Sequence, residues 1–556
     1  MQIAELGSRS SRGKIAAPIA APIAAPIAAP IAAPIAAQPP APTTMSKGNL
    51  FSALRAAFPE DLDGIAVETA DTPTPLHYTW RDLERGTAMI ANLLQGLALP
   101  PMSRIAVQVD KSVEALMLYL AVLRAGHVYL PLNNAYQASE IEYFIADAEP
   151  AVVVCASRGF GWVSTLAFKL GTRHVFTLDD DRSGTLLGRA ALQPDVHEPV
   201  HRRSDDLAAI VYTSGTTGRS KGAMLSHGNL LANALVLKDC WGWAPGDVLI
   251  HALPIFHVHG LFVAIHGALL NASRMIWFGR FEPKAVIARL PEASVFMGVP
   301  TLYVRMLAEA ALTREACRGM RLFISGSAPL LLDTFAQWQQ RSGHTILERY
   351  GMSETVMLTS NPYSPVSGRR GGTVGFPLPG VGLRVHDDQD RPLPTGEIGG
   401  IQVRGPNVFS GYWRMPEKTA EEFTEDGWFR TGDVGQIDAA GYVTIVGRSK
   451  DLVISGGYNV YPAEIEGYLN EMPGVAESAV IGVPHPDFGE GVVAVVVPRP
   501  GAALDAEALT AALKGRIAHF KVPKAIFIAP ELPRNAMGKV QKNRLREQHQ
   551  ALFAAA

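Results

Sequence analysis

Short apolar runs alternate with longer amphipathic stretches along the chain from Phe51 onward. Residues 112–124 have the apolar density and the length of a helix, which Gly126 would end. The runs 128–132 and 151–155 are short and almost continuously apolar, as buried strands are. Because helices alternate with such strands, the pattern predicts parallel sheets that are covered on both faces.

The order of elements changes toward the C-terminus. Residues 427–451 are rich in short β runs and glycine turns, and a small α+β unit follows them. In that unit we expect helices at 462–469 and 505–517, and strands at 477–483, 491–498 and 525–528. The predicted fold class is therefore α/β, with a large N-terminal domain of parallel-rich sheets and helices, a β-rich subdomain, and a small, mobile α+β C-terminal domain.

The N-terminal segment has no such pattern. Residues 15–37 repeat Ile-Ala-Ala-Pro, and a proline in every helical turn removes a backbone hydrogen bond each time. This apolar run therefore cannot be a membrane helix, and residues 1–44 are expected to form a disordered, polyproline-like tail. Two alternatives stay open: a transit peptide, suggested by basic residues such as Arg9, and translation that starts at Met45.

Composition narrows the class of protein. A chain of 556 residues is too long for one core, so two to four domains are expected. The 50 Lys and Arg residues nearly balance the 52 Asp and Glu residues, which gives no charge field for nucleic acid or an anionic membrane. The three cysteines lie far apart, so we expect a reducing, cytoplasmic compartment and no cysteine-based zinc site.

One loop has the composition of a phosphate-binding site. The apolar run 207–211 leads into a segment with glycines for close backbone approach, several hydroxyls and a cation: Thr213, Ser214, Gly215, Thr216, Thr217, Gly218 and Lys221. It is not the P-loop of standard nucleotide hydrolases, because Gly222 and Ala223 follow the lysine. A flexible surface linker is the alternative interpretation.

Several further residues each allow two interpretations. Glu354, behind Tyr-Gly-Met-Ser, suits a Mg²⁺ ion held by one carboxylate and phosphate oxygens, or is a surface residue. Asp433, after Thr-Gly, suits sugar hydroxyls or an ordinary turn. Lys539, beside Gly538, is either a tail lysine or a mobile catalytic cation.

Two segments could contact a polar substrate. His257 and His259 form a His-X-His pair without a nearby third ligand, so they are packed histidines, a metal site or the wall of a substrate pocket. Arg321 enters an apolar strand that ends at Ser325 and Ser327, and such an arginine is usually held in a salt bridge.

Five motifs occur in an order that carries a resemblance. They are Tyr-Thr-Ser-Gly-Thr-Thr-Gly-X-X-Lys-Gly, Tyr-Gly-Met-Ser-Glu, Thr-Gly-Asp, Gly-Arg-X-X-Asp and Pro-Arg-X-X-X-Gly-Lys. Over residues 51–547 the chain resembles the acyl-adenylate-forming superfamily of acyl-CoA synthetases, peptide-synthetase adenylation domains and luciferases. The resemblance implies an acid–thiol ligase that uses ATP, CoA and Mg²⁺.

The resemblance also implies a role for each motif residue. Thr213 to Gly218 and Lys221 would hold the ATP phosphates, and Glu354 with Thr213 would hold the Mg²⁺. Asp433 and Arg448 would bind the ribose, Tyr350 would lie against the adenine, and Lys539 would contact the reacting carboxylate and the α-phosphate. Lys450 would be the hinge, and Ser455, Gly456 and Gly457 would face the CoA channel. The domains expected on this basis are 45–447, a hinge at 448–450, a lid at 451–549 and a tail at 550–556. In similar synthetases the equivalent of Lys539 is acetylated, which would remove its charge and impair adenylation.

Within the superfamily the chain is most similar to malonyl-CoA synthetases, in segments 253–261, 321–330, 348–355 and 405–409. A dicarboxylate keeps a second negative charge while the first carboxylate reacts, and burying that charge unpaired would cost several kcal/mol. We therefore expect Arg321 to anchor the distal carboxylate of malonate, assisted by Ser325, Ser327 and His257. The alternatives are another short acid such as methylmalonate, propionate or acetate, and a non-catalytic nucleotide-binding relative.

Overall fold

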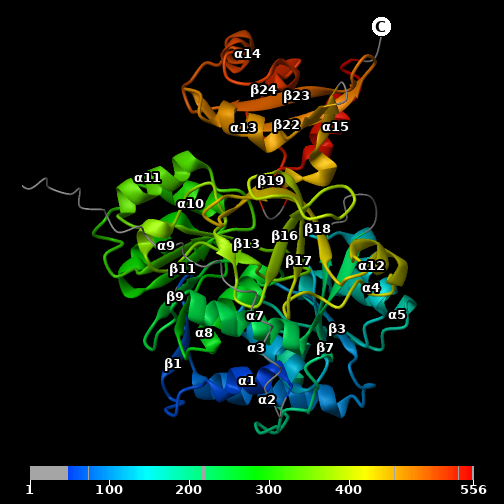
Figure 1. The fold of residues 1–556 in the computed structure, drawn as a ribbon. Coiled ribbons are helices and arrows are strands. Elements are labelled where there is room, and N and C mark those ends of the chain that lie inside the picture. The colour runs from blue at the N-terminus through cyan, green and yellow to red at the C-terminus, as the bar shows by residue number, and fades with distance from the viewer. Residues whose placement is uncertain (1–47, 73, 214–219, 456–457, 536–537, 554–556) are drawn as a thin grey trace, which may run out of the picture. The chain divides into compact units, whose positions relative to one another are not determined.

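A computed structural model describes residues 48–72, 74–213, 220–455, 458–535 and 538–553, and the described residues belong to one compact unit, Ser46–Ala556 (Figure 1). The tail expected at 1–44 and the alternative start at Met45 lie outside the described residues. Within them, the strands form four sheets.

The largest sheet has nine strands and is mainly parallel. In spatial order they are β15 (Phe376–Pro377), β14 (Thr359–Ser360), β13 (Leu347–Tyr350), β12 (Leu322–Ser325), β11 (Val295–Gly298), β9 (Val248–His251), β10 (Arg274–Trp277), β1 (Ile65–Thr69) and β2 (His77–Thr79). Strands β9 to β13 run in the same direction, so their carboxyl ends share one edge.

A second sheet has six strands and is parallel except at one edge. Its order is β6 (His174–Thr177), β5 (Val152–Cys155), β3 (Arg104–Gln108), β4 (Val128–Pro131), β7 (Leu207–Thr213) and β8 (Lys221–Ser226). The antiparallel hairpin of β7 and β8 places Thr213 opposite Lys221, so the predicted phosphate loop connects these two residues.

The two remaining sheets are smaller. The first is antiparallel and consists of β16 (Gly382–His386), β17 (Gly399–Arg404), β18 (Phe429–Ile437) and β19 (Val443–Arg448). The second consists of β21 (Tyr458–Val460), β20 (Val453–Ser455), β23 (Gly489–Pro498) and β22 (Val475–His485), with β24 (Ala525–Ile528) paired to β23. These sheets correspond to the predicted β-rich and α+β regions.

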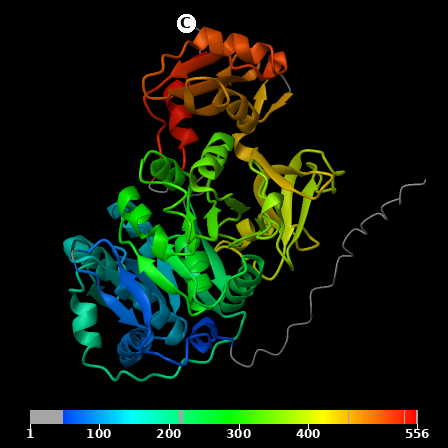
Figure 2. The same ribbon diagram turned by 90° about the vertical axis from the view of Figure 1, so that its left-hand side faces the viewer.

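Fifteen α-helices are distributed along the described residues (Figures 1 and 2). They are α1 (Leu50–Ala56), α2 (Trp80–Gly96), α3 (Val113–Arg124), α4 (Ala138–Ala148), α5 (Phe160–Lys169), α6 (Thr185–Ala190), α7 (His227–Cys240), α8 (Ile265–Leu269), α9 (Pro283–Arg289), α10 (Pro300–Leu307), α11 (Leu332–Ser342), α12 (Pro416–Glu422), α13 (Pro462–Asn470), α14 (Ala506–Lys514) and α15 (Lys542–His549). A π-helix, His259–Ala264, precedes α8.

Local signals explain where α3 begins and ends. The Ser112 side chain accepts a hydrogen bond from the Ala115 N–H, which satisfies one of the free donors of the first turn. Gly126 follows the last turn with φ +70°, a conformation that glycine adopts without strain. The helix expected over 112–124 is therefore confirmed.

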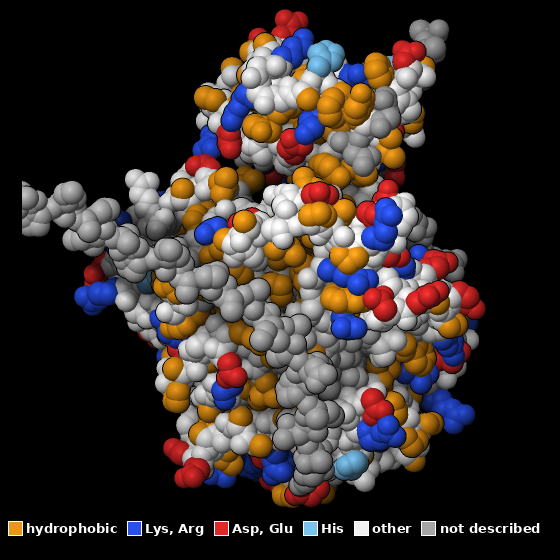
Figure 3. Space-filling view, in the orientation of Figure 1, with side chains coloured by type: hydrophobic (Ala, Val, Ile, Leu, Met, Phe, Trp, Pro, Cys, Tyr) orange, Lys and Arg blue, Asp and Glu red, His pale blue; other side chains and the backbone are white. Residues whose placement is uncertain are grey.

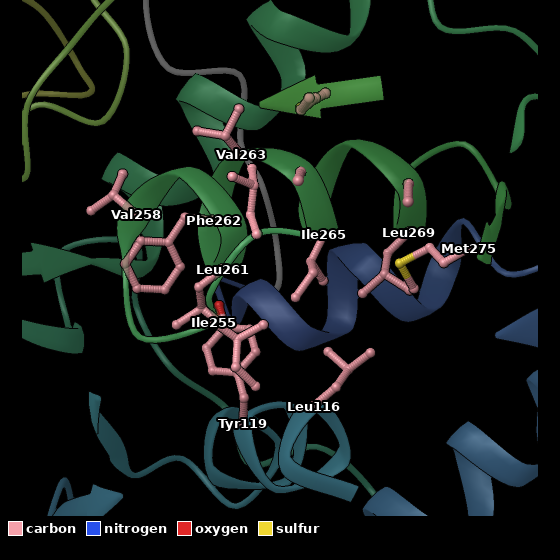
Figure 4. Packing of buried hydrophobic residues seen from close by; sticks show 14 of the residues in the cluster. Leu116, Tyr119, Ile255, Val258, Leu261, Phe262, Val263, Ile265, Leu269 and Met275 are labelled. Carbon is pink, nitrogen blue, oxygen red and sulfur yellow. The ribbon is translucent and has the colours of Figure 1, made fainter. Parts of the chain in front are cut away.

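Strand β3 shows how the parallel sheets are buried on both faces. Ile105 and Val107 belong to the largest apolar cluster, whereas Ala106 points into a second cluster with Val128 and Ile210. The largest cluster also joins α3 to the segment before α8, where Leu116 and Tyr119 point toward residues such as Leu261 (Figure 4). Each fully buried Leu or Ile contributes about 1.5–3 kcal/mol relative to an exposed one.

The surface agrees with the nearly balanced charge. On the face drawn in Figure 3, acidic and basic side chains are interspersed, and no large area of one sign stands out. Among the residues described, no helix is long and apolar enough to cross a membrane. The predicted α/β class, with parallel-rich sheets, a β-rich sheet and an α+β C-terminal part, is confirmed.

Candidate active site

Several of the predicted site residues lie at the carboxyl edge of the nine-stranded sheet. Strand β12 ends at Ser325 and β13 ends at Tyr350, and the two strands pair in parallel. The loop after β9 contains His257. In open α/β sheets, ligands bind outside this edge because loops from neighbouring strands meet there.

The phosphate loop is only partly within the described residues. Ser214, Gly215, Thr216, Thr217 and Gly218 lie outside them. Lys221 is described, and its Nζ lies 3.3 Å from Oε1 of Glu422 and 4.2 Å from the ring centroid of Tyr412. The lysine at the end of the loop is therefore held between a carboxylate and an aromatic face.

Three residues from separate strands meet as the sequence predicts for a nucleoside site. The Tyr350 hydroxyl donates to Oδ2 of Asp433, and Nε of Arg448 lies 2.9 Å from Oδ1 of the same carboxylate. Strands β18 and β19 place Asp433 opposite Arg448. Gly432, within β18, precedes the aspartate with φ +72°, a conformation that glycine adopts without strain.

Glu354 is a buried carboxylate that is 6% exposed. Burial raises its pKa, and hydrogen bonds from its own backbone and from the Tyr412 hydroxyl partly counteract that effect. No group of three or more His, Cys, Asp or Glu side chains suitable for a metal occurs in the described part of the chain. One buried carboxylate nevertheless fits Mg²⁺, which usually takes one or two carboxylates together with substrate phosphate oxygens.

Lys539 lies close enough to the other site residues to interact with their charges. The surrounding protein and the positive charge of Arg448 lower its pKa, whereas Asp433 and Glu354 act in the opposite direction. The Lys539 N–H donates a hydrogen bond of 3.0 Å to Oδ1 of Asn535. The structure therefore brings the predicted catalytic lysine to the predicted metal and ribose residues.

The residues predicted for the hinge and the CoA channel follow β19. Lys450 is exposed and lies in a short 3₁₀ turn, Ser449–Asp451, and Ser455 is buried at the end of β20. Gly456 and Gly457 lie outside the described residues. The hinge and channel roles stay predictions.

The assignment of Arg321 to the distal carboxylate is wrong. Arg321 precedes β12 and therefore lies at the amino edge of the sheet, about four residues and about 13 Å from the edge where Ser325 lies. Its guanidinium forms a bidentate ion pair with Asp247 and donates to the Trp241 carbonyl at 3.2 Å. Burial disfavours both charges, but the pairing outweighs it, so the pKa of Asp247 lies below and that of Arg321 above its ordinary value.

A different arginine occupies the carboxyl edge. Arg349, in β13, is 2% exposed, and among the described residues no hydrogen-bond partner reaches its Nε, Nη1 or Nη2. Burial lowers its pKa to about 9. We interpret a buried guanidinium without an acceptor as a group that awaits an anion, because an uncompensated buried charge costs several kcal/mol.

Gly326 makes room for this guanidinium. A Cβ at position 326 would lie 2.5 Å from Cζ of Arg349, which is closer than real Cβ contacts occur. His259 lies near enough for the Arg349 charge to contribute to the lowering of its pKa, for which burial is the main cause. Nδ1 of His259 lies 3.3 Å from Oγ of Ser327. We call Arg349, Gly326, His259 and Ser327 the Arg349 cluster.

The other two residues expected around the acid lie beside the Arg349 cluster. His257 contributes to the electrostatic environment of His259, and its own pKa is lowered to about 3, mainly by burial and further by the charge of Lys539. Oγ of Ser325 is buried, and the described residues provide it with no hydrogen-bond partner. A substrate bound between Arg349 and Lys539 would therefore lie near polar side chains, such as Ser325, that have a hydrogen-bonding atom without a partner among the described residues.

Two family models match the chain: one described as AMP-binding enzyme over residues 63–413, and one described as AMP-binding enzyme C-terminal domain over residues 464–539. The chain belongs to the AMP-binding enzyme family. The predicted nucleotide residues Tyr350 and Lys221 lie within the first match, and Lys539 is the last residue of the second. Asp433 and Arg448 lie between the two matches, where the four-stranded sheet supplies them.

Relatives in this family act on different acids, as their names state. A malonate–CoA ligase of Arabidopsis thaliana is 33% identical over 550 residues, covering 90% of this chain and 89% of the relative. A feruloyl-CoA synthase of an Amycolatopsis species is 34% identical over 477 residues, covering 84% and 93%. The crystal structure of ATP-bound MatB from Rhodopseudomonas palustris shares 52% identity and a TM-score of 0.88, covering 91% and 100%.

Proposed function

We propose that this protein is an ATP-dependent malonate–CoA ligase, which converts malonate, ATP and CoA into malonyl-CoA, AMP and diphosphate. Similarity to the plant malonate–CoA ligase supports this proposal, but a feruloyl-CoA synthase is equally similar in sequence. The observation that favours malonate is the buried Arg349 guanidinium without a partner. A ferulate side chain or a fatty acyl chain would leave that charge uncompensated, whereas the distal carboxylate of malonate pairs with it.

In the first half-reaction, a carboxylate oxygen attacks the α-phosphorus of ATP, and the bond to diphosphate breaks. Two anions must approach each other, so the site has to compensate negative charge. Lys539 contacts the reacting carboxylate and the α-phosphate, and Thr213 to Gly218 with Lys221 hold the phosphates. Glu354, with Thr213, would hold Mg²⁺, which supplies positive charge to the phosphates when bound. Asp433 and Arg448 bind the ribose, and Tyr350 lies against the adenine.

In the second half-reaction, the CoA sulfur attacks the acyl carbon of malonyl-adenylate, AMP leaves, and the thiol proton is released. We propose that the lid at 451–549 turns about the hinge at Lys450 between the two steps, so that Ser455 to Gly457 face the incoming thiol. Such movement would withdraw Lys539 after adenylation, when its charge is no longer needed. Acetylation of Lys539 would block only the first step.

Malonate itself would span two positive charges. Arg349 and Lys539 lie within electrostatic range of each other; the charge of Lys539 contributes to the lowered pKa of His257, and that of Arg349 to the lowered pKa of His259. The distal carboxylate pairs with Arg349, with Ser325, Ser327 and His257 as polar neighbours, and the reacting carboxylate faces Lys539. A cytoplasmic location remains a prediction from the cysteine content, and some relatives are named as mitochondrial.

The test is an AMP-release assay that depends on CoA, run with acetate, propionate, malonate, methylmalonate, succinate and octanoate. We expect malonate to have the highest kcat/KM and propionate, which lacks the distal charge, to be at least about a hundredfold poorer. Malonyl-CoA should be identified as the product by mass spectrometry. Equal rates with propionate and malonate would contradict the assignment of malonate while leaving the ligase activity intact.

A further inference from the structure

Tyr412 lies between the two charged groups that the triphosphate requires. Its hydroxyl donates to Oε1 of Glu354 at 3.1 Å, and its ring lies beneath the Lys221 ammonium, 4.2 Å from Nζ to the ring centroid. Tyr412 is 4% exposed, so both contacts are largely shielded from water. One side chain therefore touches the carboxylate proposed for Mg²⁺ and the lysine proposed for the phosphates.

The backbone around Tyr412 is attached to both partners. The Phe409 N–H donates to the Glu354 carbonyl at 2.8 Å. On the other side, the Met224 N–H donates to the Gly411 carbonyl at 3.0 Å, which ties the segment to strand β8. The Tyr412 N–H is held by Oγ1 of Thr419 at 2.9 Å. These bonds fix the position of the tyrosine relative to the strand that begins with Lys221 and to the loop that carries Glu354.

Both contacts of Tyr412 favour charged partners. The hydrogen bond from the Tyr412 hydroxyl to the Glu354 carboxylate fixes the direction in which that carboxylate faces, and a hydroxyl bonds more strongly to a carboxylate than to a neutral acceptor. The face of an aromatic ring attracts an ammonium. Glu422 also pairs with Lys221, at 3.3 Å, so the lysine is held by an anion and a ring before phosphates arrive.

We propose that Tyr412 is a positioning residue for the metal–triphosphate site: its hydroxyl keeps the Glu354 carboxylate oriented for Mg²⁺, and its ring keeps Lys221 at the phosphates. The proposal rests on the proposed magnesium-dependent adenylation but not on the identity of the acid. The alternative is that Tyr412 is a core tyrosine with a satisfied hydroxyl and no effect on metal binding. The two interpretations differ in what happens when only the hydroxyl is removed.

The test compares Tyr412→Phe with Tyr442→Phe as a matched control. Tyr442 also has a buried ring, but its hydroxyl donates at 2.7 Å to the Gly368 backbone carbonyl and not to Glu354. Mn²⁺ replaces Mg²⁺ as the probe, and its dissociation constant is measured by electron paramagnetic resonance with a non-reacting ATP analogue. We expect about tenfold weaker Mn²⁺ binding in Tyr412→Phe and less than twofold in the control.

A second measurement separates the hydroxyl from the ring. Binding of the same ATP analogue without metal should be unchanged in Tyr412→Phe, which keeps the ring under Lys221, and about threefold weaker in Tyr412→Leu. In a double-mutant cycle, Tyr412→Phe should add little to the Mn²⁺ defect of Glu354→Gln, because both act through one carboxylate.

Two results would overturn the proposal. The first is Mn²⁺ binding by Tyr412→Phe that matches wild type, and the second is an equal loss of Mn²⁺ and of metal-free nucleotide, which indicates general damage to the site. A wild-type protein that binds neither probe would instead contradict the proposed function. Melting temperatures of both phenylalanine variants establish that each one is folded.

Discussion

A half-buried arginine, Arg321, and a buried arginine, Arg349, lie at opposite edges of the nine-stranded sheet, and their surroundings differ. At the amino edge, Arg321 has a bidentate carboxylate partner in Asp247 and a carbonyl acceptor. At the carboxyl edge, Arg349 is more deeply buried, and within the described residues its guanidinium has no acceptor. An arginine side chain thus has a charged partner at one edge of the sheet and none among the described residues at the other.

This difference distinguishes a structural arginine from one that binds a ligand. The charge of Arg321 is already paired with Asp247 in the folded chain, so the pair contributes to stability and the guanidinium has no uncompensated charge for a substrate to pair with. Arg349 reduces stability, because a buried guanidinium without an anion is desolvated and uncompensated. An anionic substrate that pairs with Arg349 therefore gains binding free energy from this ion pair. A substrate with a neutral group in that position gains none.

The largest expected effect concerns acid preference. Arg349→Gln should lower kcat/KM for malonate by about 30- to several thousandfold, equivalent to about 2–5 kcal/mol, with kcat/KM for propionate nearly unchanged. Steady-state assays with both acids measure the ratio. Arg321→Gln is the matched control and should leave that ratio unchanged. If Arg321→Gln changed the ratio as much as Arg349→Gln, the contrast between the two edges would be lost.

For stability we expect the reverse: replacing Arg321 should destabilise the protein more than replacing Arg349. Arg321→Met leaves the Asp247 carboxylate, which is 5% exposed, without its main partner, and should cost about 2–4 kcal/mol, a fall of several degrees in apparent melting temperature. Arg349→Met removes an uncompensated charge and should leave the melting temperature unchanged or raise it. Thermal unfolding monitored by fluorescence, without substrates, compares the two. A larger destabilisation by Arg349→Met would contradict our interpretation of the Arg349 cluster.

A smaller effect is expected from moving Arg349 rather than removing it. Gly326→Ala places a methyl group against the guanidinium, which must shift, so KM for malonate should rise about 10- to 30-fold, while KM for ATP stays the same. The control is Gly467→Ala, because a Cβ there meets nothing within 4 Å. That variant should match wild type in both constants. An unchanged KM for malonate in Gly326→Ala would mean that Arg349 does not need its present position.

The smallest expected effect is a pH dependence. Burial lowers the pKa of Arg349 to about 9, so raising the pH through 9 removes its positive charge from the ligand-free enzyme. The ratio of kcat/KM for malonate to kcat/KM for propionate should therefore fall severalfold between pH 8 and pH 10. Lys539 also has a lowered pKa, but it acts on both acids and cancels in the ratio. A ratio that stays constant across this range would argue against Arg349 as the anchor.

Much of the fold was determined by local sequence. The run 128–132 and the segment 525–528 were predicted as strands because continuous apolar character and flanking turns suffice for a buried strand, and the structure has β4 and β24 there. The helix at 112–124 followed from its apolar density and the glycine after it. The composition of the loop that ends at Lys221 indicated only a polyphosphate, because glycines, hydroxyls and a cation suit any phosphate group. The resemblance carried by the ordered motifs with Tyr350, Asp433 and Lys539 indicated ATP.

The choice between Arg321 and Arg349 was not available from the sequence. Both arginines adjoin apolar strands near a motif, and Arg321 was assigned because a guanidinium suits the second carboxylate of a dicarboxylic acid, without Arg349 being considered. Only the pairing of parallel strands shows that Arg321 and Asp247 precede their strands at one edge, while Arg349 and Ser325 lie toward the other. Whether a buried charge has a partner can depend on a residue far away in the sequence: Asp247 and Arg321 are 74 positions apart. No local sequence pattern shows that two such residues will form an ion pair.

The sequence by itself therefore determined the class of fold and the nucleotide motifs, since these depend on residues near one another in the chain. The tertiary structure decided which buried charges are paired and which are left for a ligand. Pairing needs two side chains within a few ångströms, and long-range packing alone brings Asp247 to Arg321, Gly326 to Arg349, and Tyr412 to both Glu354 and Lys221.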